Sequence, residues 1–183
     1  SYKSILFATE KGLMSGIGGG KFDPKGTLTR GMVVSVLYRM SYSPKVEYTE
    51  RFEDVAKGKW YTDAILWAQS QGIVNGVSAT KFNPTGVITR EQIATILYNF
   101  ANYRYVVLAD PADLSGYSDY KKVSSFALEG MQWANSEGLI VGNDNKLDPK
   151  GKATREQFAS ILDRFYNADF EYDVAYGAPQ VQS

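Results

Sequence analysis

The sequence repeats itself three times, and this repetition constrains the fold more than any other feature. The central copy of the motif runs over residues 72–92, with Gly-x-x-x-Gly, then Lys-x-x-Pro, a further Gly and finally Thr-Arg. The same motif stands 60 residues upstream and 65 or 66 residues downstream. Repeats of this length are supersecondary units that bury their apolar faces against one another. We therefore predict three tandem repeats and a tail, over residues 1–44, 45–105, 106–169 and 170–183.

Each copy is predicted to fold as helix, loop, helix. The second helix carries apolar residues at i, i+3, i+4 and i+7, the spacing of one buried helix face. These residues are Ile93, Ile96, Leu97 and Phe100 in the central copy, and Val33, Val36, Leu37, Met40, Phe158, Ile161, Leu162 and Phe165 in the other two. One such face per copy buries best against the other two. We therefore predict an all-α fold, a pseudo-threefold trimer of helix-loop-helix repeats around a central three-helix bundle.

The first helix of each copy is shorter and carries one aromatic residue on its apolar side. Its recurring residues are Ile5, Phe7 and Ala8, then Ile65, Trp67 and Ala68, then Met131, Trp133 and Ala134. We expect the aromatic residues to pack in the core. The glycines that follow, Gly12, Gly72 and Gly138, are expected to end these helices. Linkers are predicted at 41–49 and 104–115, where the helical pattern stops near a proline.

The composition excludes several classes of function. The chain contains no His and no Cys, which rules out His-based catalytic triads, His-ligated zinc, thiol nucleophiles and disulfides. Lys plus Arg equals Asp plus Glu at 20 each, so we expect no nucleic-acid partner. No apolar run approaches the length of a membrane span, so no membrane insertion is expected. The segment 143–148 is only faintly similar to a calcium loop, and neither a metal nor a cofactor is predicted.

The Thr-Arg pair at the start of each second helix is the best candidate for a binding site. Thr89 with Gln92, and Thr154 with Gln157, predict capping boxes, whereas Thr29 can make only half of one. The arginines Arg30, Arg90 and Arg155 then occupy the first helical position, where a cation is unfavourable by about 0.3–1 kcal/mol. Three such placements suggest an anionic partner. That partner is either a ligand carboxylate or phosphate, or an internal carboxylate such as Asp54 or Asp119.

Other residues near this motif could contribute to a ligand site. A lysine stands nine residues before each arginine, at Lys21, Lys81 and Lys146. The aromatic residues Trp60, Tyr61 and Tyr120 offer flat faces of the kind that sugars stack on. Solvated surface is the alternative role for the lysines, and core or rim packing is the alternative for the aromatic residues.

The motifs together resemble a known family. They are Phe52-Glu53-Asp54-Val55 with Trp60-Tyr61, the turn 72–76, Phe82-Asn83-Pro84 and Thr89-Arg90-Glu91-Gln92. Over residues 1–167 the chain resembles three tandem S-layer homology domains. The resemblance implies a secreted bacterial module at the cell wall, or S-layer, that binds secondary cell-wall polysaccharide in grooves between neighbouring copies. The carboxylate of a pyruvylated terminal sugar would be the anion.

The resemblance also assigns roles to single residues. The acid group would meet Arg30, Arg90 and Arg155 beside the threonines Thr29, Thr89 and Thr154. Sugar hydroxyls would donate to Asp54 and Asp119, and the glycines Gly16, Gly76 and Gly142 would let the glycan approach the backbone.

The sequence departs from the family pattern in each copy. Gly31-Met32 follows the first arginine in place of the usual small or acidic pair. Tyr120 replaces a usual Val, and the third copy has no Trp in its lead-in segment, which is the stretch before its first helix. The first copy lacks a lead-in, which we attribute to where the chain starts; a less favoured alternative is that residues 170–174 replace it in space.

The sequence therefore predicts a non-catalytic anchor, since no repeated acid–base pair of carboxylates is recognisable. Two alternatives remain open. The repeats could serve assembly with other surface-layer subunits, or the chain could be the anchoring segment of a longer exoenzyme. The residues 1–7 do not have the shape of a signal peptide, although a mature or trimmed chain would have lost one.

Overall fold

The computed structural model describes residues 25–107, 111–167 and 172–174. The chain divides into two compact units. Unit 1 comprises residues 1–88 and 152–166, and unit 2 comprises residues 89–151 and 167–183. The predicted first helix of the first copy, together with Gly12, Gly16 and Lys21, lies outside the described residues.

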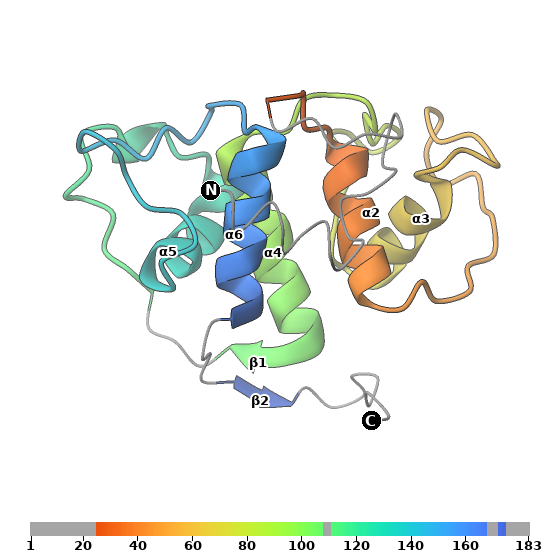
Figure 1. The fold of residues 1–183 in the computed structure, drawn as a ribbon. Helices are drawn as coiled ribbons and strands as arrows, with labels where there is room; N and C mark the ends of the chain where they lie inside the picture. Colours follow the sequence, from red (N-terminus) through yellow and green to blue (C-terminus); the bar gives the residue numbers. More distant parts are fainter. Residues whose placement is uncertain (1–24, 108–110, 168–171, 175–183) are drawn as a thin grey trace. The chain divides into compact units, whose positions relative to one another are not determined.

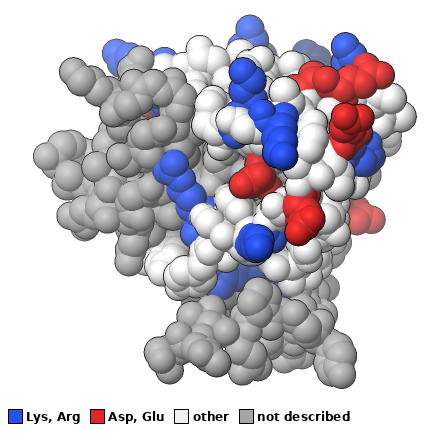
Figure 2. Space-filling model, turned by 90° about the vertical axis from the view of Figure 1, so that its right-hand side faces the viewer, with Lys and Arg blue, Asp and Glu red and all other residues white. Residues whose placement is uncertain are grey.

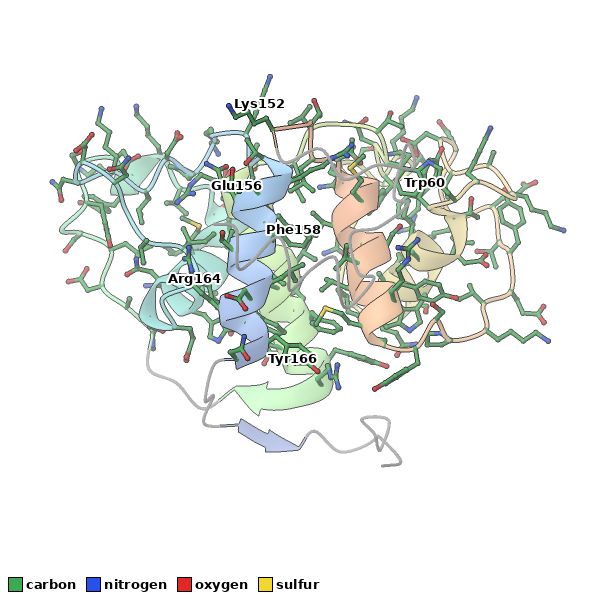
Figure 3. All side chains as sticks on the ribbon, viewed as in Figure 1. Trp60, Lys152, Glu156, Phe158, Arg164 and Tyr166 are labelled. Atoms are coloured by element: carbon green, nitrogen blue, oxygen red, sulfur yellow. The ribbon has the colours of Figure 1, made fainter. Side chains whose placement is uncertain are left out.

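Unit 1 contains three of the described helices, and two of them pack side by side. The three helices are α2 (Arg30–Met40), α3 (Thr62–Ser70) and α6 (Arg155–Asn167), whose last residue is assigned to unit 2. Figure 1 shows α3 lying beside α2, and the rings of Tyr38 on α2 and Trp67 on α3 are 5.5 Å apart at their centroids. The buried Phe158 points from α6 into the interior, whereas Lys152 before the helix points outward (Figure 3).

Unit 2 repeats this helix pairing with different residues. Its helices are α4 (Arg90–Arg104) and α5 (Leu128–Ser136), with the short 3₁₀ helices η1 (Tyr120–Lys122) and η2 (Ser125–Ala127) before α5. Figure 1 shows α5 packed on α4, and the rings of Tyr98 and Trp133 are 5.7 Å apart. A Cβ on Gly130 would lie 2.9 Å from the Cα of Thr95, so the glycine allows the two helices to approach closely.

The predicted apolar faces of α2, α4 and α6 are buried. Every residue of the three faces is at most 6% exposed, apart from the half-buried Met40. The first-helix residues Ile65, Trp67, Ala68, Met131, Trp133 and Ala134 are at most 3% exposed, which confirms their core role. The described part of the chain is helical, as predicted, apart from one short pair of strands.

That pair of strands joins a predicted linker to the tail within unit 2. Strand β1 (Tyr105–Val107) follows α4 directly and pairs antiparallel with β2 (Tyr172–Val174), so that Tyr105 lies opposite Val174. The linker prediction for 104–115 missed β1, because its partner is distant in the sequence and each strand has only three residues.

The glycines after α3 and α5 end these helices as predicted. Gly72 has φ 73° and Gly138 has φ 70°, values that favour glycine. The N–H of the residue that follows each glycine, Ile73 or Leu139, donates at 2.8 Å to a carbonyl in the last turn of the helix. This closing bond is typical of a glycine-terminated helix.

Short backbone links in unit 1 join the segments that lead into the long helices. The N–H of Ile88 donates to the carbonyl of Leu28 at 3.0 Å, and that of Ala153 donates to the carbonyl of Ile88 at 3.4 Å. These three residues occupy equivalent positions in the three copies, and each is at most 4% exposed. Unit 1 therefore brings together one equivalent segment from every copy.

Candidate functional site

The three Thr-Arg pairs lie where the sequence predicts, at the starts of the long helices. The helices α2, α4 and α6 begin at Arg30, Arg90 and Arg155. Thr89 and Gln92 bond to each other's backbone N–H, and so do Thr154 and Gln157, which confirms both capping boxes. Thr29 accepts from the N–H of Met32 at 3.2 Å, the expected half of the arrangement.

The first N–H groups of α2 and α4 bond to the loop of the following copy. In unit 1, Arg30 N donates to Gly86 O at 3.0 Å and Gly31 N to Pro84 O at 2.8 Å. In unit 2, Arg90 N donates to Gly151 O at 2.9 Å and Glu91 N to Pro149 O at 3.0 Å. Helix starts leave such donors without intrahelical partners. Here loop carbonyls accept the hydrogen bonds of the first two N–H groups of each helix.

The arginine side chains bond to the same loops. Arg30 Nε donates to Phe82 O at 2.9 Å and Nη2 to Asn75 O at 3.2 Å, and its Cζ lies 4.6 Å from the centre of the Phe82 ring. Arg90 repeats the pattern, from Nε to Leu147 O at 2.9 Å and from Nη2 to Val141 O at 3.2 Å. We call this arrangement the carbonyl clamp.

The clamp differs from the internal carboxylate partner that the sequence suggested for the arginines, whereas the ligand anion remains a prediction. Within the described residues, Arg30 and Asp54 form no ion pair, although the Asp54 charge acts on the guanidinium. Burial lowers the pKa of Arg30, which is 6% exposed, and Asp54 offsets part of that effect. In the third copy, Arg155 Nε donates to Thr27 O at 3.2 Å.

The lead-in aspartates hold the loops from the other side. Asp54 accepts from Phe82 N at 2.9 Å and Asn83 N at 2.7 Å, one bond to each carboxylate oxygen. Asp119 accepts in the same way from Leu147 N at 2.8 Å and Asp148 N at 2.9 Å. Both aspartates thus have a structural role besides the predicted contact with sugar hydroxyls.

Burial and hydrogen bonding shift the pKa of Asp119 in opposite directions. Burial on its own raises the pKa of this carboxyl, but the N–H groups of Leu147 and Asp148, its own N–H and the charge of Lys122 lower it. The net result is a pKa below the ordinary value. The ionised form therefore stabilises the folded loop.

Two of the glycines predicted to admit a glycan, Gly76 and Gly142, are already required by their own loops. A Cβ on Gly76 would lie 2.4 Å from Ser78 O and 2.5 Å from Lys81 O. A Cβ on Gly142 would lie 2.2 Å from Cε1 of the Tyr117 ring. A side chain at either position would force the neighbouring atoms to move, whether or not a ligand approaches.

An aromatic pair covers the residue after the arginine in α2. The Cη2 of Trp60 lies 3.5 Å from the position of a Cβ on Gly31, and Figure 3 shows Trp60 beside the start of α2. Trp60 meets Tyr61 edge to face, with centroids 5.1 Å apart. Tyr61 is buried, but Trp60 is 49% exposed, so the predicted flat apolar face is accessible. We call Arg30, Gly31, Trp60 and the loop carbonyls the α2 site.

A buried carboxylate stands at the equivalent position of α4. Glu91 is 2% exposed and lies 2.5 Å from Lys150 Nζ. It also accepts from the N–H and hydroxyl of Ser124, at 2.9 and 2.8 Å, and Lys150 bonds to the same hydroxyl. We call Arg90, Glu91, Lys150, Ser124 and the loop carbonyls the α4 site.

Two features of these sites were not predicted from the sequence, the carboxylate cluster at Glu91 and the exposed aromatic residue Phe126. Phe126 is 61% exposed and lies 66 positions after Trp60, the same offset that relates Met131 to Ile65. Counting back from the first helix would have identified Phe126 as the counterpart of Trp60 in the third copy.

The other predicted residues in the described ranges, Lys81, Lys146 and Tyr120, do not bond to the arginines. Lys81 and Lys146 are exposed on their loops, and Tyr120 is 37% exposed. Among the described residues, no group of three Asp or Glu side chains could hold a metal ion. No helix in the described ranges is long and apolar enough to cross a membrane.

Comparison with protein families gives one match, repeated along the chain. The sequence profile of the S-layer homology domain matches residues 1–31, 51–94 and 116–159. The three matched segments correspond to the three predicted copies.

Similar proteins fall into two groups, surface-layer proteins and enzymes. The chain is 30% identical over 88% of its length to the Surface-layer 125 kDa protein of Lysinibacillus sphaericus, and 30% identical over 79% to the S-layer protein sap of Bacillus anthracis. It is 28% identical over 82% of its length to an amylopullulanase of Thermoanaerobacterium thermosulfurigenes. The chain spans only 14%, 16% and 8% of these three relatives, respectively.

Proposed function

The chain belongs to the S-layer homology domain family, and on that premise we propose that it is a non-catalytic module that anchors protein to the bacterial cell wall. The ligand we propose is an acidic secondary cell-wall polysaccharide with pyruvylated terminal sugars. Surface-layer proteins and an amylopullulanase share this segment. Anchoring is a role that suits both kinds of relative, whatever each carries elsewhere in its chain.

The observation that carries the proposal is the charge of the α2 site together with its exposed aromatic face. Arg30 is buried and bonded only to neutral carbonyls in the described part of the chain, so its positive charge is not neutralised by an ion pair. The positive end of the α2 dipole lies at the same place. The half-exposed Trp60 provides an apolar face beside this charge. A sugar ring that bears a carboxylate matches both features.

Attraction to a general surface charge is a weaker explanation for binding. Figure 2 shows positive and negative side chains interspersed on the face that includes α3. The counts of basic and acidic residues in the whole chain are equal. Recognition of an acidic glycan therefore has to come from a local site rather than from the net charge.

We further propose that the three copies form a pseudo-threefold trimer with a groove between each copy and the next. The carbonyl clamp supports this proposal, since the helix start of one copy binds the loop of the following copy in both units. The bond of Arg155 to Thr27 links the third copy to the first in the same sense. Three related sites would follow, at α2, α4 and α6.

The test is calorimetric titration with purified wall polysaccharide, before and after its pyruvate ketals are removed. We expect binding that is lost on removal, and at least tenfold weaker binding by Trp60→Ala. The matched control is Tyr42→Ala, because Tyr42 is 77% exposed and lies outside the α2 site. Equal binding to both polysaccharides would contradict the acidic ligand. Concentration-dependent self-association without any glycan binding would favour assembly with other surface-layer subunits.

A further inference from the structure

We infer that Glu91 excludes an acidic ligand from the α4 site, so that the residue after the clamping arginine decides which sites accept an acidic sugar. The inference deepens the proposed function and rests on it. Its starting point is that two helix starts share one clamp but differ at this position, which is Gly31 in α2 and Glu91 in α4.

The donors of the α4 site are already occupied by a carboxylate of the chain itself. Glu91 accepts hydrogen bonds from the Lys150 ammonium, the Ser124 N–H and the Ser124 hydroxyl. These are the kinds of donors that an incoming carboxylate would need. Because Glu91 is 2% exposed, water screens its charge poorly, and a second carboxylate beside it would be repelled.

The α2 site has neither this carboxylate nor its lysine. Thr85 stands at the position of Lys150, and Gly31 has no side chain. A Cβ on Gly31 would lie 2.8 Å from Pro84 O and 3.5 Å from Trp60 Cη2, so Gly31 itself is covered and the accessible surface of this site is the Trp60 ring. The nearby Asp54 already accepts from two backbone N–H groups. An acidic sugar at this site meets Arg30 and an apolar ring rather than a buried carboxylate.

The aromatic residues near the two sites also differ. Trp60 packs toward Gly31, whereas its counterpart Phe126 is 61% exposed. At α4 the space beside the helix start is filled by Lys150 and Ser124, and the exposed ring of Phe126 retains an apolar face. The two sites therefore differ in how they would receive an acid group, although each has an exposed aromatic residue, Trp60 in the α2 site and Phe126 close in the sequence to Ser124 of the α4 site.

The experiment titrates the full chain with a monosaccharide glycoside that carries a pyruvate ketal, and with the same glycoside without it. Calorimetry gives the number of sites and their affinities for the wild type, Glu91→Gly and Glu91→Gln. The second variant keeps the shape of the side chain and removes its charge, so it guards against misfolding of the first. Glu129→Gln is the matched control, because it removes an exposed charge in the first turn of α5.

We expect Glu91→Gly to bind one more equivalent of the ketal glycoside than the wild type. Glu91→Gln is expected to bind the ketal glycoside at the α4 site at least tenfold more tightly than the wild type does. Glu129→Gln is expected to match the wild type in both the number of sites and their affinities. Ketal binding by the wild type, with the same number of sites in both Glu91 variants, would overturn the inference alone. No binding by the wild type or by either variant would overturn the proposed function as well.

Discussion

The starts of α2 and α4 share the same arginine clamp but differ in the residue that follows the arginine. Each places an arginine at the first helical position, and each arginine donates from Nε at 2.9 Å and from Nη2 at 3.2 Å to carbonyls of the next copy. The residue that follows is a glycine under a half-exposed indole in α2, but a buried glutamate with a lysine in α4. The shared geometry comes from backbone carbonyls, and the difference comes from side chains.

The comparison divides the residues into those that hold the fold together and those that we expect to contact a ligand. The clamp, the capping threonines and the lead-in aspartates all hold one copy to the next or close a loop. Trp60, Gly31 and Glu91 vary between the copies without disturbing that framework. Variants of the first group should therefore change stability first, and variants of the second group should change binding first.

The largest expected effect is loss of the more buried arginine. Arg30→Ala leaves the carbonyls of Phe82 and Asn75 without their charged donor, and hydrogen bonds to charged groups contribute about 1.5–3 kcal/mol each. We expect the free energy of unfolding to fall by about 3 kcal/mol, as measured by chemical denaturation.

Arg90→Ala is the matched variant, and we expect it to lose less because Arg90 is only half-buried. An equal or larger loss for Arg90→Ala would show that burial of the arginine does not determine how much each clamp stabilises the fold. If neither variant lowers the free energy of unfolding, the clamp does not hold the copies together.

The lead-in aspartates should give the next largest effect, about 1–3 kcal/mol. Asp119→Asn retains one carbonyl oxygen for the two N–H groups of Leu147 and Asp148, so one donor loses its acceptor. Asp54→Asn should cost less, because one of its donors, Asn83 N, is exposed to water. Thermal unfolding of both variants measures the difference, and a larger loss for Asp54→Asn would contradict the order.

The lowered pKa of Asp119 also predicts the direction of a pH effect. The ionised group stabilises the fold fully above the ordinary Asp pKa of about 4, and this contribution is lost as the pH falls toward the lower folded-state value. The gap in stability between wild type and Asp119→Asn should therefore narrow below about pH 4. A gap that is constant over an acid titration would show that the charge contributes nothing.

A smaller effect is expected where the α4 site has an ion pair and the α2 site has none. Lys150→Ala removes the cation beside the buried Glu91, although Ser124 still supplies two donors. Because Lys150 is 56% exposed, we expect a loss of about 1 kcal/mol. Thr85→Ala at the equivalent position should be close to neutral, and urea denaturation of the pair tests this. Equal losses would show that the Glu91–Lys150 pair does not stabilise unit 2.

Much of this organisation could be predicted from the sequence because it depends on local patterns. The helix starts, the capping boxes at Thr89 and Thr154, and the terminating Gly72 and Gly138 follow from residue types at fixed spacing. The buried faces follow from helical periodicity in the same way.

The partners of the arginines could not be predicted, because a backbone carbonyl has no sequence signature. Arg30 and Arg90 bond to Asn75 and Val141, two unrelated residues that share only their main-chain oxygen. The Glu91 cluster joins residues up to 59 positions apart, and β1 pairs with a strand near the other end of the chain. These contacts depend on how the copies pack, which local patterns do not specify.

The most direct test of the α2 site uses the fluorescence of its tryptophan. The chain has three Trp residues, and Trp67 and Trp133 are each 3% exposed, so an aqueous quencher reaches mainly Trp60. Quenching of the wild-type protein by acrylamide would be measured with pyruvylated wall polysaccharide and with the same polymer after ketal removal. We predict that only the pyruvylated polymer protects the accessible fluorescence. Unchanged quenching of Trp60, with the polymer shown to be bound by co-sedimentation, would contradict the α2 site.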